Sequence, residues 1–272
     1  MSHPVLGALL VLLATPGWAQ DRRAVEQERQ EFLSWVRASP ISPLKAVAVR
    51  EIGPPPGLSL GPPDADIPLA GSRVGRLTQE PGRVRLESAQ GATTIVRGRA
   101  FALAPSWQLL VTGPPGGATV TVFGPRPIAT RQPDWFTYDS TLRVLVTLAP
   151  SKTSNVIRLL APDGVEVEAT EAGVVTGRIG TSTFSLRVFR FPGTVAEETE
   201  LEIYFRDETS GRGTYSAGRF VSLIPSPGGR HVVDFNRARN PFCAYNTVYP
   251  CPAPWRGNVL QVPIRGGEKY VE

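Results

Sequence analysis

Residues 200–235 read ELEIYFRDETSGRGTYSAGRFVSLIPSPGGRHVVDF. Three runs in this stretch are rich in apolar, β-branched and aromatic residues, namely Glu200–Phe205, Phe220–Ile224 and His231–Phe235. Between them lie Gly, Pro, Asp and Ser, the residues that form turns. Short runs of this composition separated by turn residues are typical of consecutive strands. The stretch therefore predicts part of an antiparallel sheet.

The same pattern extends over most of the chain, whereas helical periodicity is confined to its N-terminal part. A clear example is Thr119–Val122, where polar and apolar residues alternate. The further predicted strands are Ala46–Glu51, Val74–Leu77, Arg83–Glu87, Thr93–Arg97, Trp107–Thr112, Ala118–Phe123, Thr141–Thr147, Asn155–Leu160, Val165–Glu168, Thr183–Phe189 and Asn258–Ile264. Short strands with frequent turns predict a mainly β protein, an antiparallel sandwich or split barrel.

Residues 1–19 are predicted to be a signal peptide. An apolar run at residues 5–14 is too short to span a bilayer comfortably and is followed by Pro16, Gly17, Trp18 and Ala19, so cleavage is expected after Ala19. An uncleaved membrane anchor and a misassigned start codon are the alternatives. The prediction is an exported protein, periplasmic or extracellular, with no membrane span after removal of the signal.

Residues 20–45 are predicted to form a helix and a connector. Within Asp21–Ala38 an apolar stripe is expected to dock on a sheet, and prolines end the helix. The β-rich domain then covers residues 46–272. Two stretches rich in proline or glycine, Gly53–Pro63 and Pro125–Pro133, are predicted connectors, and the second could divide the domain into two lobes.

The charge and the histidine count exclude several classes of function. The chain has 29 Lys and Arg residues, a net charge of +5 and no dense basic block, so nucleic acid is not an expected partner. A mild positive field favours an anionic ligand, or is simply a solvated surface. Only His231 remains after loss of His3, which excludes a multi-histidine zinc site. No cofactor or metal is expected, and the sequence does not determine the oligomeric state.

Cys243 and Cys251 are the only cysteines of the chain. In an oxidising compartment they could close a small disulfide loop, worth about 2.5 kcal/mol on chain-entropy arithmetic. Buried free thiols are the second interpretation. A redox or metal role is the third, and the spacing is not the C-x-x-C of redox motifs.

Polar and aromatic side chains are dense between Arg206 and Tyr270, which is where we expect any site. Arg219 and Lys269 would hold an anionic group, Asp and Asn side chains would orient it, and tyrosines would supply an aromatic wall. The candidate ligand-binding residues are Tyr215, Arg219, Asp234, Asn236, Asn240, Tyr245 and Lys269.

Two other interpretations of the same segment stay open. One is an architectural cluster in which Asp and Asn side chains cap turns. The other is a carboxylate-using hydrolase in which two of Asp207, Asp234 and Glu268 face each other as acid and base. The preferred hypothesis is a binding or structural domain without catalysis.

The C-terminal third resembles a known family. The residues that carry the resemblance are Asp207-x-Thr209-Ser210-Gly211, Thr214-Tyr215-x-x-Gly218-Arg219, Asp234-Phe235-Asn236-Arg237-Ala238-x-Asn240-Pro241-x-Cys243-Ala244-Tyr245, Cys251-Pro252-x-Pro254, Asn258 and Gly267-Glu268-Lys269. Together they are similar to the signature of the bacterial family called domain of unknown function 1684, most strongly over residues 200–270.

The resemblance implies a β-rich single domain and no established activity. It also implies members without an export signal, which weakens the case for an obligatory disulfide. The chain departs from the pattern at Arg239, where an aromatic residue is expected, and at Phe242, where a proline is expected. Ala253 and Trp255 also alter the proline-rich run after Cys251. If the position of Arg239 lined a pocket, the arginine would change the charge of that pocket.

Overall fold

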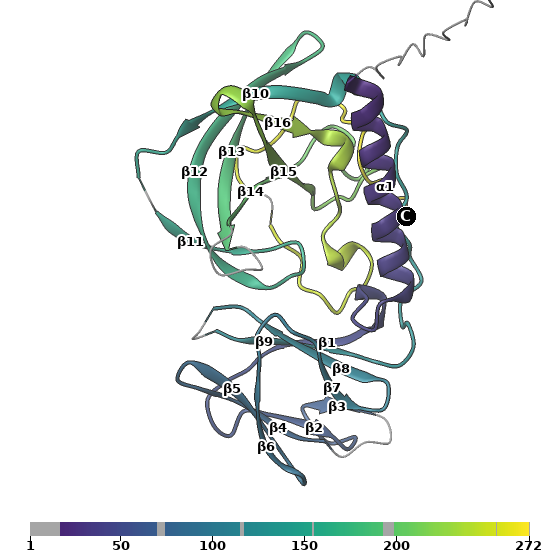
Figure 1. Ribbon diagram of the computed structural model, residues 1–272, viewed down its shortest axis with the longest axis vertical. Coiled ribbons are helices and arrows are strands. Elements are labelled where there is room, and N and C mark those ends of the chain that lie inside the picture. Colours follow the sequence, from purple (N-terminus) through teal and green to yellow (C-terminus); the bar gives the residue numbers. More distant parts are fainter. Residues whose placement is uncertain are drawn as a thin grey trace, which may run out of the picture.

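The computed structural model describes residues 17–69, 74–114, 117–153, 155–192, 199–253 and 255–271. Most of the expected signal peptide lies outside these ranges. The described chain forms one long helix and two separate sheet systems, each with its own apolar core (Figure 1). The prediction of a mainly β protein with one N-terminal helix is confirmed. None of its helices is both long and apolar enough to cross a membrane, as far as the chain is described.

Helix α1 covers Gly17–Ala38 and therefore begins four residues before the predicted helix. Its apolar stripe is buried as expected, with Val25 and Val36 each only 1% exposed. Phe32 stacks on Trp35 and also contacts the ring of Tyr245, which comes from the C-terminal third. The helix thus packs against the segment that the sequence marks as the candidate site.

The first sheet system is a sandwich built from residues 46–123. One sheet has the order β1 (Ala46–Glu51), β9 (Thr119–Phe123), β8 (Trp107–Thr112), β7 (Phe101–Ala104). The other has the order β3 (Ile67–Pro68), β2 (Leu58–Gly61), β4 (Gly75–Glu80), β5 (Arg83–Ser88), β6 (Gly91–Ile95). All pairs are antiparallel except the short β2–β3 pair. Alternate residues such as Val111 and Val120 point into the shared core, as the period of two requires.

The second sheet system closes into a barrel of six strands because β10 pairs with both β16 and β12. Around the barrel the strands are β10 (Arg143–Pro150), β16 (Arg230–Asp234), β15 (Arg219–Ser226), β14 (Thr199–Phe205), β13 (Ser182–Pro192) and β12 (Glu166–Ile179). Strand β11 (Val156–Leu160) extends the sheet outside the closed ring. Closure pairs the edges of the sheet, and its interior is filled by buried side chains such as Leu186, Ile203 and Val233.

Two local predictions are wrong. Asn258–Ile264 is not a strand and forms only an isolated bridge, between Arg206 and Val259. Its apolar residues alternate because Leu260 and Ile264 fill the barrel core, a packing role that the sequence does not distinguish from a strand face. The predicted connector Gly53–Pro63 is not purely irregular, because it contains strand β2. This short strand is held in the sheet by its pairing with β4, which comes later in the chain.

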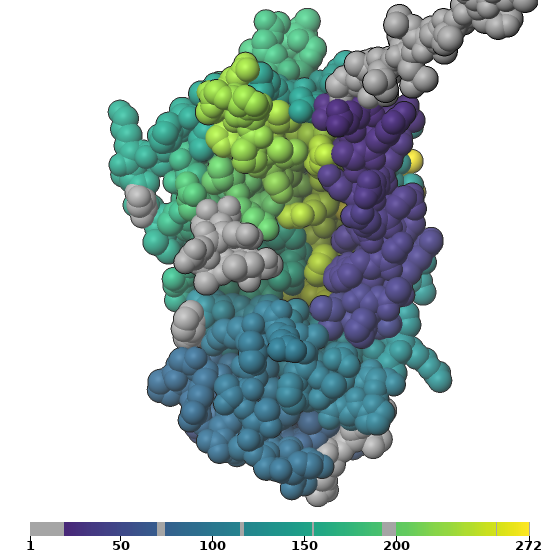
Figure 2. All heavy atoms as spheres, viewed as in Figure 1, coloured from purple at the N-terminus to yellow at the C-terminus, as the bar shows by residue number. Residues whose placement is uncertain are grey.

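After β16 the chain runs through short 3-10 helices, η4 (Phe235–Arg237) and η5 (Phe242–Ala244), and then without regular structure through the rest of its described residues. The shorter helices earlier in the chain are η1 (Pro43–Lys45), η2 (Ser140–Leu142) and η3 (Pro227–Gly229). In the space-filling view the C-terminal segment is a strip between α1 and the barrel (Figure 2). This strip holds most of the candidate residues.

Candidate functional site

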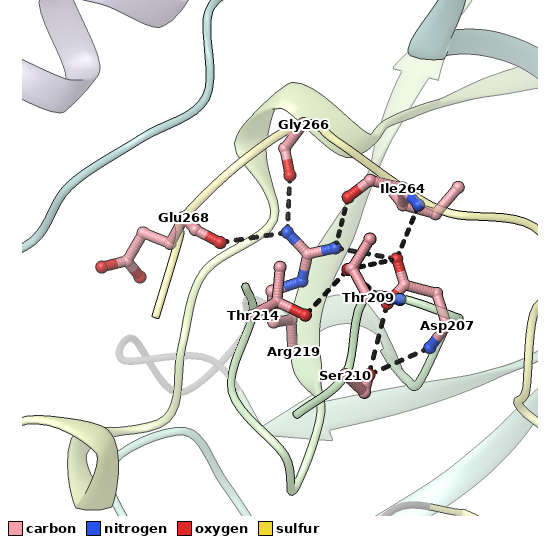
Figure 3. Close-up of polar contacts among 8 residues, drawn as sticks. All are labelled: Asp207, Thr209, Ser210, Thr214, Arg219, Ile264, Gly266 and Glu268. Carbon is pink, nitrogen blue, oxygen red and sulfur yellow. Dashed lines mark hydrogen bonds and ion pairs between the residues drawn. The ribbon is translucent and has the colours of Figure 1, made fainter. Parts of the chain in front are cut away.

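Arg219 is the centre of a buried polar cluster at the start of β15 (Figure 3). Its Nη2 donates to the Asp207 carboxylate at 3.1 Å and to the Ile264 carbonyl at 2.9 Å. Its Nη1 donates to the carbonyls of Gly266 and Glu268. The Arg219 side chain is only 1% exposed. A guanidinium with these four acceptors holds the C-terminal segment against the barrel and does not face a ligand.

Asp207 forms the other half of this cluster. Its carboxylate accepts from the backbone N–H and the hydroxyl of Thr209 and from the backbone N–H of Ile264. Ser210 also donates to it, and Thr209 is hydrogen-bonded to Thr214. Thus the glycine-rich connection 207–219 folds as a turn closed by its own Asp and Thr side chains, as such residues commonly do.

Asp234 and Asn236 form a second, separate cluster at the end of β16. Asp234 caps η4 by accepting from the Asn236 backbone N–H, and its Oδ2 accepts from Arg237 at 2.6 Å. The Asn236 side chain bonds the backbone of Asp139 in both directions, at 2.8 Å each. Both residues are completely buried. Their hydrogen bonds join the barrel to the preceding chain, which is the architectural role that the sequence left open.

A third cluster surrounds the carboxylate of Glu268. The backbone carbonyl of Glu268 accepts a hydrogen bond from Arg219, but the side-chain carboxylate points away from Arg219 (Figure 3). One carboxylate oxygen accepts from the Asn240 backbone N–H at 2.6 Å, and the other accepts from the Tyr245 hydroxyl. Gly267, at φ 72°, turns the chain so that the Glu268 N–H reaches the Ala238 carbonyl at 2.8 Å. The glycine therefore aims the side chain of its neighbour.

Glu268, Asn240 and Tyr245 form the floor of a small cavity, which we call the Glu268 cavity. Its volume is about 110 Å³. The lining residues are Arg131, Gln132, Asp134, Asn240, Tyr245, Glu268, Lys269 and Val271. The floor is buried, and the wall carries both signs of charge. The cavity is smaller than the pockets that bind drug-sized molecules, and its hydrogen-bonding groups converge, so it suits a small polar ligand.

Burial dominates the electrostatics of the cavity floor. Desolvation raises the pKa of the Glu268 carboxyl to about 7, although the Tyr245 hydroxyl and the Asn240 N–H both stabilise its charged form. Desolvation and the nearby Glu268 charge raise the pKa of the Tyr245 hydroxyl well above its ordinary value. Tyr245 therefore stays protonated and donates to Glu268. The carboxyl itself is poised to exchange a proton near neutral pH.

The two cationic groups of the wall differ in how they are held. Arg131 Nη1 donates to the Val271 carbonyl at 2.6 Å, and the guanidinium lies 4.0 Å from the centre of the Tyr270 ring. Lys269 forms a 3.4 Å ion pair with Asp134, whose side chain is 71% exposed. Exposed pairs of this type contribute about 0–1 kcal/mol, so the Lys269 ammonium is readily redirected.

Tyr215 lies beside the two cysteines. Its hydroxyl is 3.4 Å from the Cys243 sulfur and 3.3 Å from the Cys251 sulfur. The cysteines approach each other to 2.8 Å and are not bonded. Cys243 is buried and Cys251 is exposed. The Tyr215 ring also packs edge-on against Tyr270 at 4.8 Å, so the rings of Tyr215 and Tyr270 connect the thiol pair to Arg131.

The structure thus brings only part of the predicted site together. Asn240, Tyr245 and Lys269 line the Glu268 cavity together with Glu268, a residue proposed from the sequence only as a carboxylate catalyst. Arg219 lies in the Asp207 cluster, and Tyr215 lies at the cysteines. Asp234 and Asn236 lie at η4.

Four lining residues were missed by sequence reasoning, namely Arg131, Gln132, Asp134 and Val271. The first two belong to a stretch interpreted as a proline-rich connector, and nothing in the composition of that stretch indicates a site. Arg239 does not line the cavity. Instead its guanidinium pairs with Glu202 on β14 at 2.9 Å. In the described part of the chain no group of His, Cys, Asp and Glu is arranged to hold a metal ion.

Comparison with known proteins supplies a family without an activity. The family described as "Protein of unknown function (DUF1684)" matches residues 131–269. Among solved structures, the chain is similar to an uncharacterized protein of Haloarcula marismortui determined by solution NMR, with 30% identity and a TM-score of 0.44. That match covers 51% of this chain and 76% of the archaeal one. No curated protein matches the chain significantly.

Proposed function

Because the chain belongs to the DUF1684 family, whose description assigns no activity, we propose its function from the geometry of the Glu268 cavity. The protein is a non-catalytic binding protein that holds a small anionic ligand there. The observation that carries this proposal is that Arg131 and Lys269 line one cavity together with the buried groups of Glu268, Tyr245 and Asn240.

The charges of the wall support an anionic group. Among the described residues no carboxylate pairs with Arg131, and its Nη1 donates to the Val271 carbonyl. A guanidinium offers donors on two edges, so it can keep that bond and still bind a carboxylate or phosphate oxygen. The Lys269 ammonium pairs with the exposed Asp134 and lies 5.5 Å from the centre of the Phe136 ring, and it can contribute the second charge.

The commitment of the other carboxylates favours binding over catalysis. Asp207 is saturated by Arg219, Thr209 and Ile264. Asp234 is held by Asn236 and Arg237. Neither lines the Glu268 cavity. A pair of opposed carboxylates drawn from the three candidates is therefore not available at this place.

The test is a titration of the labelled protein with a panel of small carboxylates (acetate, glycolate, lactate and glycine), followed by amide chemical shifts. We expect millimolar binding that perturbs amides around Glu268, because so few ligand atoms contact the protein. Arg131→Gln should weaken it about tenfold, the usual value of one charge-assisted hydrogen bond. Arg158→Gln, at a 69% exposed arginine on β11, is the matched control. If no panel member binds the wild-type chain, the proposed function is wrong.

One observation favours an alternative, an acid–base hydrolase acting in the cell envelope. Burial places the pKa of the Glu268 carboxyl at about 7, which suits a general acid or base at neutral pH. Its test is a screen with nitrophenyl esters, phosphates and glycosides. Turnover that inflects near pH 7 and is lost in Glu268→Gln would support the enzyme. Absence of turnover, or equal turnover in the variant, would reject it.

We also propose that the protein is exported and that Cys243 and Cys251 become a disulfide in the oxidising compartment. The apolar run at residues 5–14 and the 2.8 Å approach of the cysteines support this. Oxidation removes two protons and two electrons, which pass to a disulfide-bearing oxidant by thiol–disulfide exchange. Mass spectrometry of the native protein should find an N-terminus at Gln20 and a mass two hydrogens lower than after reduction. Unprocessed N-termini with alkylatable thiols would contradict both points.

A further inference from the structure

The Glu268 cavity is lined by two chemically different sets of groups, which we call its cationic end and its acceptor end. Arg131 and Lys269 contribute only hydrogen-bond donors with positive charge. Asn240 and Glu268 contribute side-chain oxygens that act as acceptors. A ligand that only carries negative charge satisfies the first end and leaves the second without a partner.

Asn240 has an acceptor that nothing satisfies. Its Nδ2 donates to the Lys269 carbonyl at 3.1 Å, and this contact identifies the Nδ2 end of the amide, because two oxygens cannot share a hydrogen bond. Its Oδ1 is shielded from water and accepts no hydrogen bond from any described residue. The residue is only 4% exposed. A buried acceptor without a donor is uncommon in folded proteins and calls for an explanation.

The Glu268 carboxylate also has acceptor capacity left. Each of its oxygens accepts one hydrogen bond, one from the Asn240 N–H and the other from the Tyr245 hydroxyl. A carboxylate oxygen accepts two hydrogen bonds. Glu268 and Asn240 both line the Glu268 cavity. Together they suit a group that carries several N–H donors, and most of all a cationic one.

Size narrows the ligand further. A cavity of about 110 Å³ holds roughly four water molecules at the liquid volume of about 30 Å³ each. A ligand that replaces this water has only a few non-hydrogen atoms. A ligand whose two charged groups lie close together in one small molecule fits this volume.

Resting on the proposed anion site, we propose that the ligand is a small zwitterion of the amino-acid type. Its carboxylate binds Arg131 and Lys269, and its ammonium group donates to the Asn240 Oδ1 and to the Glu268 carboxylate. Lys269 can leave Asp134 and contact the ligand carboxylate because the Lys269–Asp134 ion pair is exposed. The floor then binds the ammonium group, so the cavity binds a zwitterion in preference to a carboxylate without an ammonium group.

The proposal makes a prediction about protons. The charged or titratable groups around Glu268 are Tyr245, Arg29, Arg219, Arg239 and the wall residues Arg131, Asp134 and Lys269. A guanidinium group is not deprotonated in proteins, and Tyr245 stays protonated. A bound ammonium group favours the charged form of Glu268, whose pKa lies at about 7, and so releases a proton. A bound anion alone favours the neutral form and takes up a proton.

The experiment is calorimetric titration at pH 7 with glycine, acetate and methylammonium, each in two buffers of different ionisation enthalpy. We expect glycine to bind at least about tenfold more tightly than acetate or methylammonium, because only glycine satisfies both ends. Its binding should release a fraction of a proton. If acetate binds as tightly as glycine, with proton uptake, the zwitterion is wrong and the anion site survives. If none of the three binds, both fail.

Variants locate the effect. Arg131→Gln lies at the surface of the wall and should fold normally while binding glycine about tenfold more weakly. Asn240→Ala removes the unpaired acceptor and should weaken glycine binding while leaving acetate binding unchanged. If Asn240→Ala fails to fold, Glu268→Gln serves instead, because it keeps the shape and should abolish proton release. Equal glycine affinity in Arg131→Gln and in the control Arg158→Gln would overturn the assignment.

Discussion

The guanidinium of Arg219 and the carboxylate of Asp207 lie 3.1 Å apart with side chains only 1% and 0% exposed. The pair joins the start of β15 to the turn that precedes it and, through Ile264 and Gly266, to the C-terminal strip. A charged pair this deep is stable only with its hydrogen bonds complete. It is a structural joint that also bonds the backbone carbonyl of Glu268.

Arg219→Met should destabilise the protein strongly. The variant leaves the Asp207 carboxylate buried without its counter-charge and leaves three carbonyls without donors, so we expect a loss of about 3–5 kcal/mol in the free energy of unfolding. Urea denaturation followed by tryptophan fluorescence measures it. Arg158→Met on the exposed face of β11 should change stability by less than about 0.5 kcal/mol. A loss below about 1 kcal/mol for Arg219→Met would show that the pair does not hold the strip.

Arg237 should matter more than the residue with which it pairs on α1. Arg237 bonds both the buried Asp234 and Glu28 of α1. Arg237→Gln uncovers the completely buried Asp234 charge and should cost about 2–3 kcal/mol. Glu28→Gln affects a side chain that is 52% exposed and should cost less than about 1 kcal/mol. Thermal unfolding of the two variants compares them, and equal losses would contradict the assignment.

Gly267→Ala should be far more damaging than an alanine at another glycine with the same backbone conformation. A Cβ at Gly267 would lie 2.4 Å from the Ala238 carbonyl oxygen and 2.8 Å from that of Phe235. We expect a loss of about 3 kcal/mol or more, since a steric clash adds to the left-handed conformation. Gly228→Ala, at φ 74° with nothing within 4 Å, should cost only about 1 kcal/mol. Equal melting temperatures for the two variants would refute the close approach.

Glu268 should make stability fall as the pH rises. Burial raises the pKa of its carboxyl from 4.5 to about 7, so the folded chain binds a proton that the unfolded chain has released in that interval. At about 1.4 kcal/mol per unit, the contribution is present below pH 4.5 and about 3 kcal/mol is lost by the time the pH has passed 7. Denaturation at several pH values measures the slope.

Glu268→Gln provides the control for this slope. The glutamine oxygen can still accept from the Asn240 N–H, and the Tyr245 hydroxyl can turn to accept from the new amide. We therefore expect the variant to unfold with a flatter pH profile and to be more stable than the wild-type chain at pH 8. Glu166→Gln, at a 55% exposed side chain, should follow the wild-type profile. Parallel profiles for wild type and Glu268→Gln would exclude a raised pKa at this carboxyl.

Alternation of apolar and polar residues was enough to predict the fold class and most strands. Ala46–Glu51 and Trp107–Thr112 were predicted to the residue, because runs of apolar, β-branched and aromatic residues between turn residues are typical of strands. Asn258–Ile264 shows the limit of the method. Its apolar residues also alternate, but they fill the end of a barrel whose strands come from elsewhere in the chain.

The candidate site shows the same division. The density of polar and aromatic residues after Arg206 indicated Asn240, Tyr245 and Lys269 as candidates, and these three line one cavity. This density did not distinguish them from Arg219 or Asp234, because an arginine buried in a structural joint and an arginine that binds a ligand are the same residue type in the sequence. Burial decides between them, and burial is a property of the folded chain.

By itself, the sequence determined the local features of this protein: the N-terminal helix, the strand pattern and the turns closed by Asp207 and Asp234, since each depends on residues only a few positions apart. Tertiary structure alone decided that Arg131 would join Glu268 across 137 residues and that Arg219 would lose contact with solvent. The physical reason is that barrel closure and the docking of α1 set which side chains meet and which are desolvated. Charge, pKa and access to a ligand all follow from those two conditions.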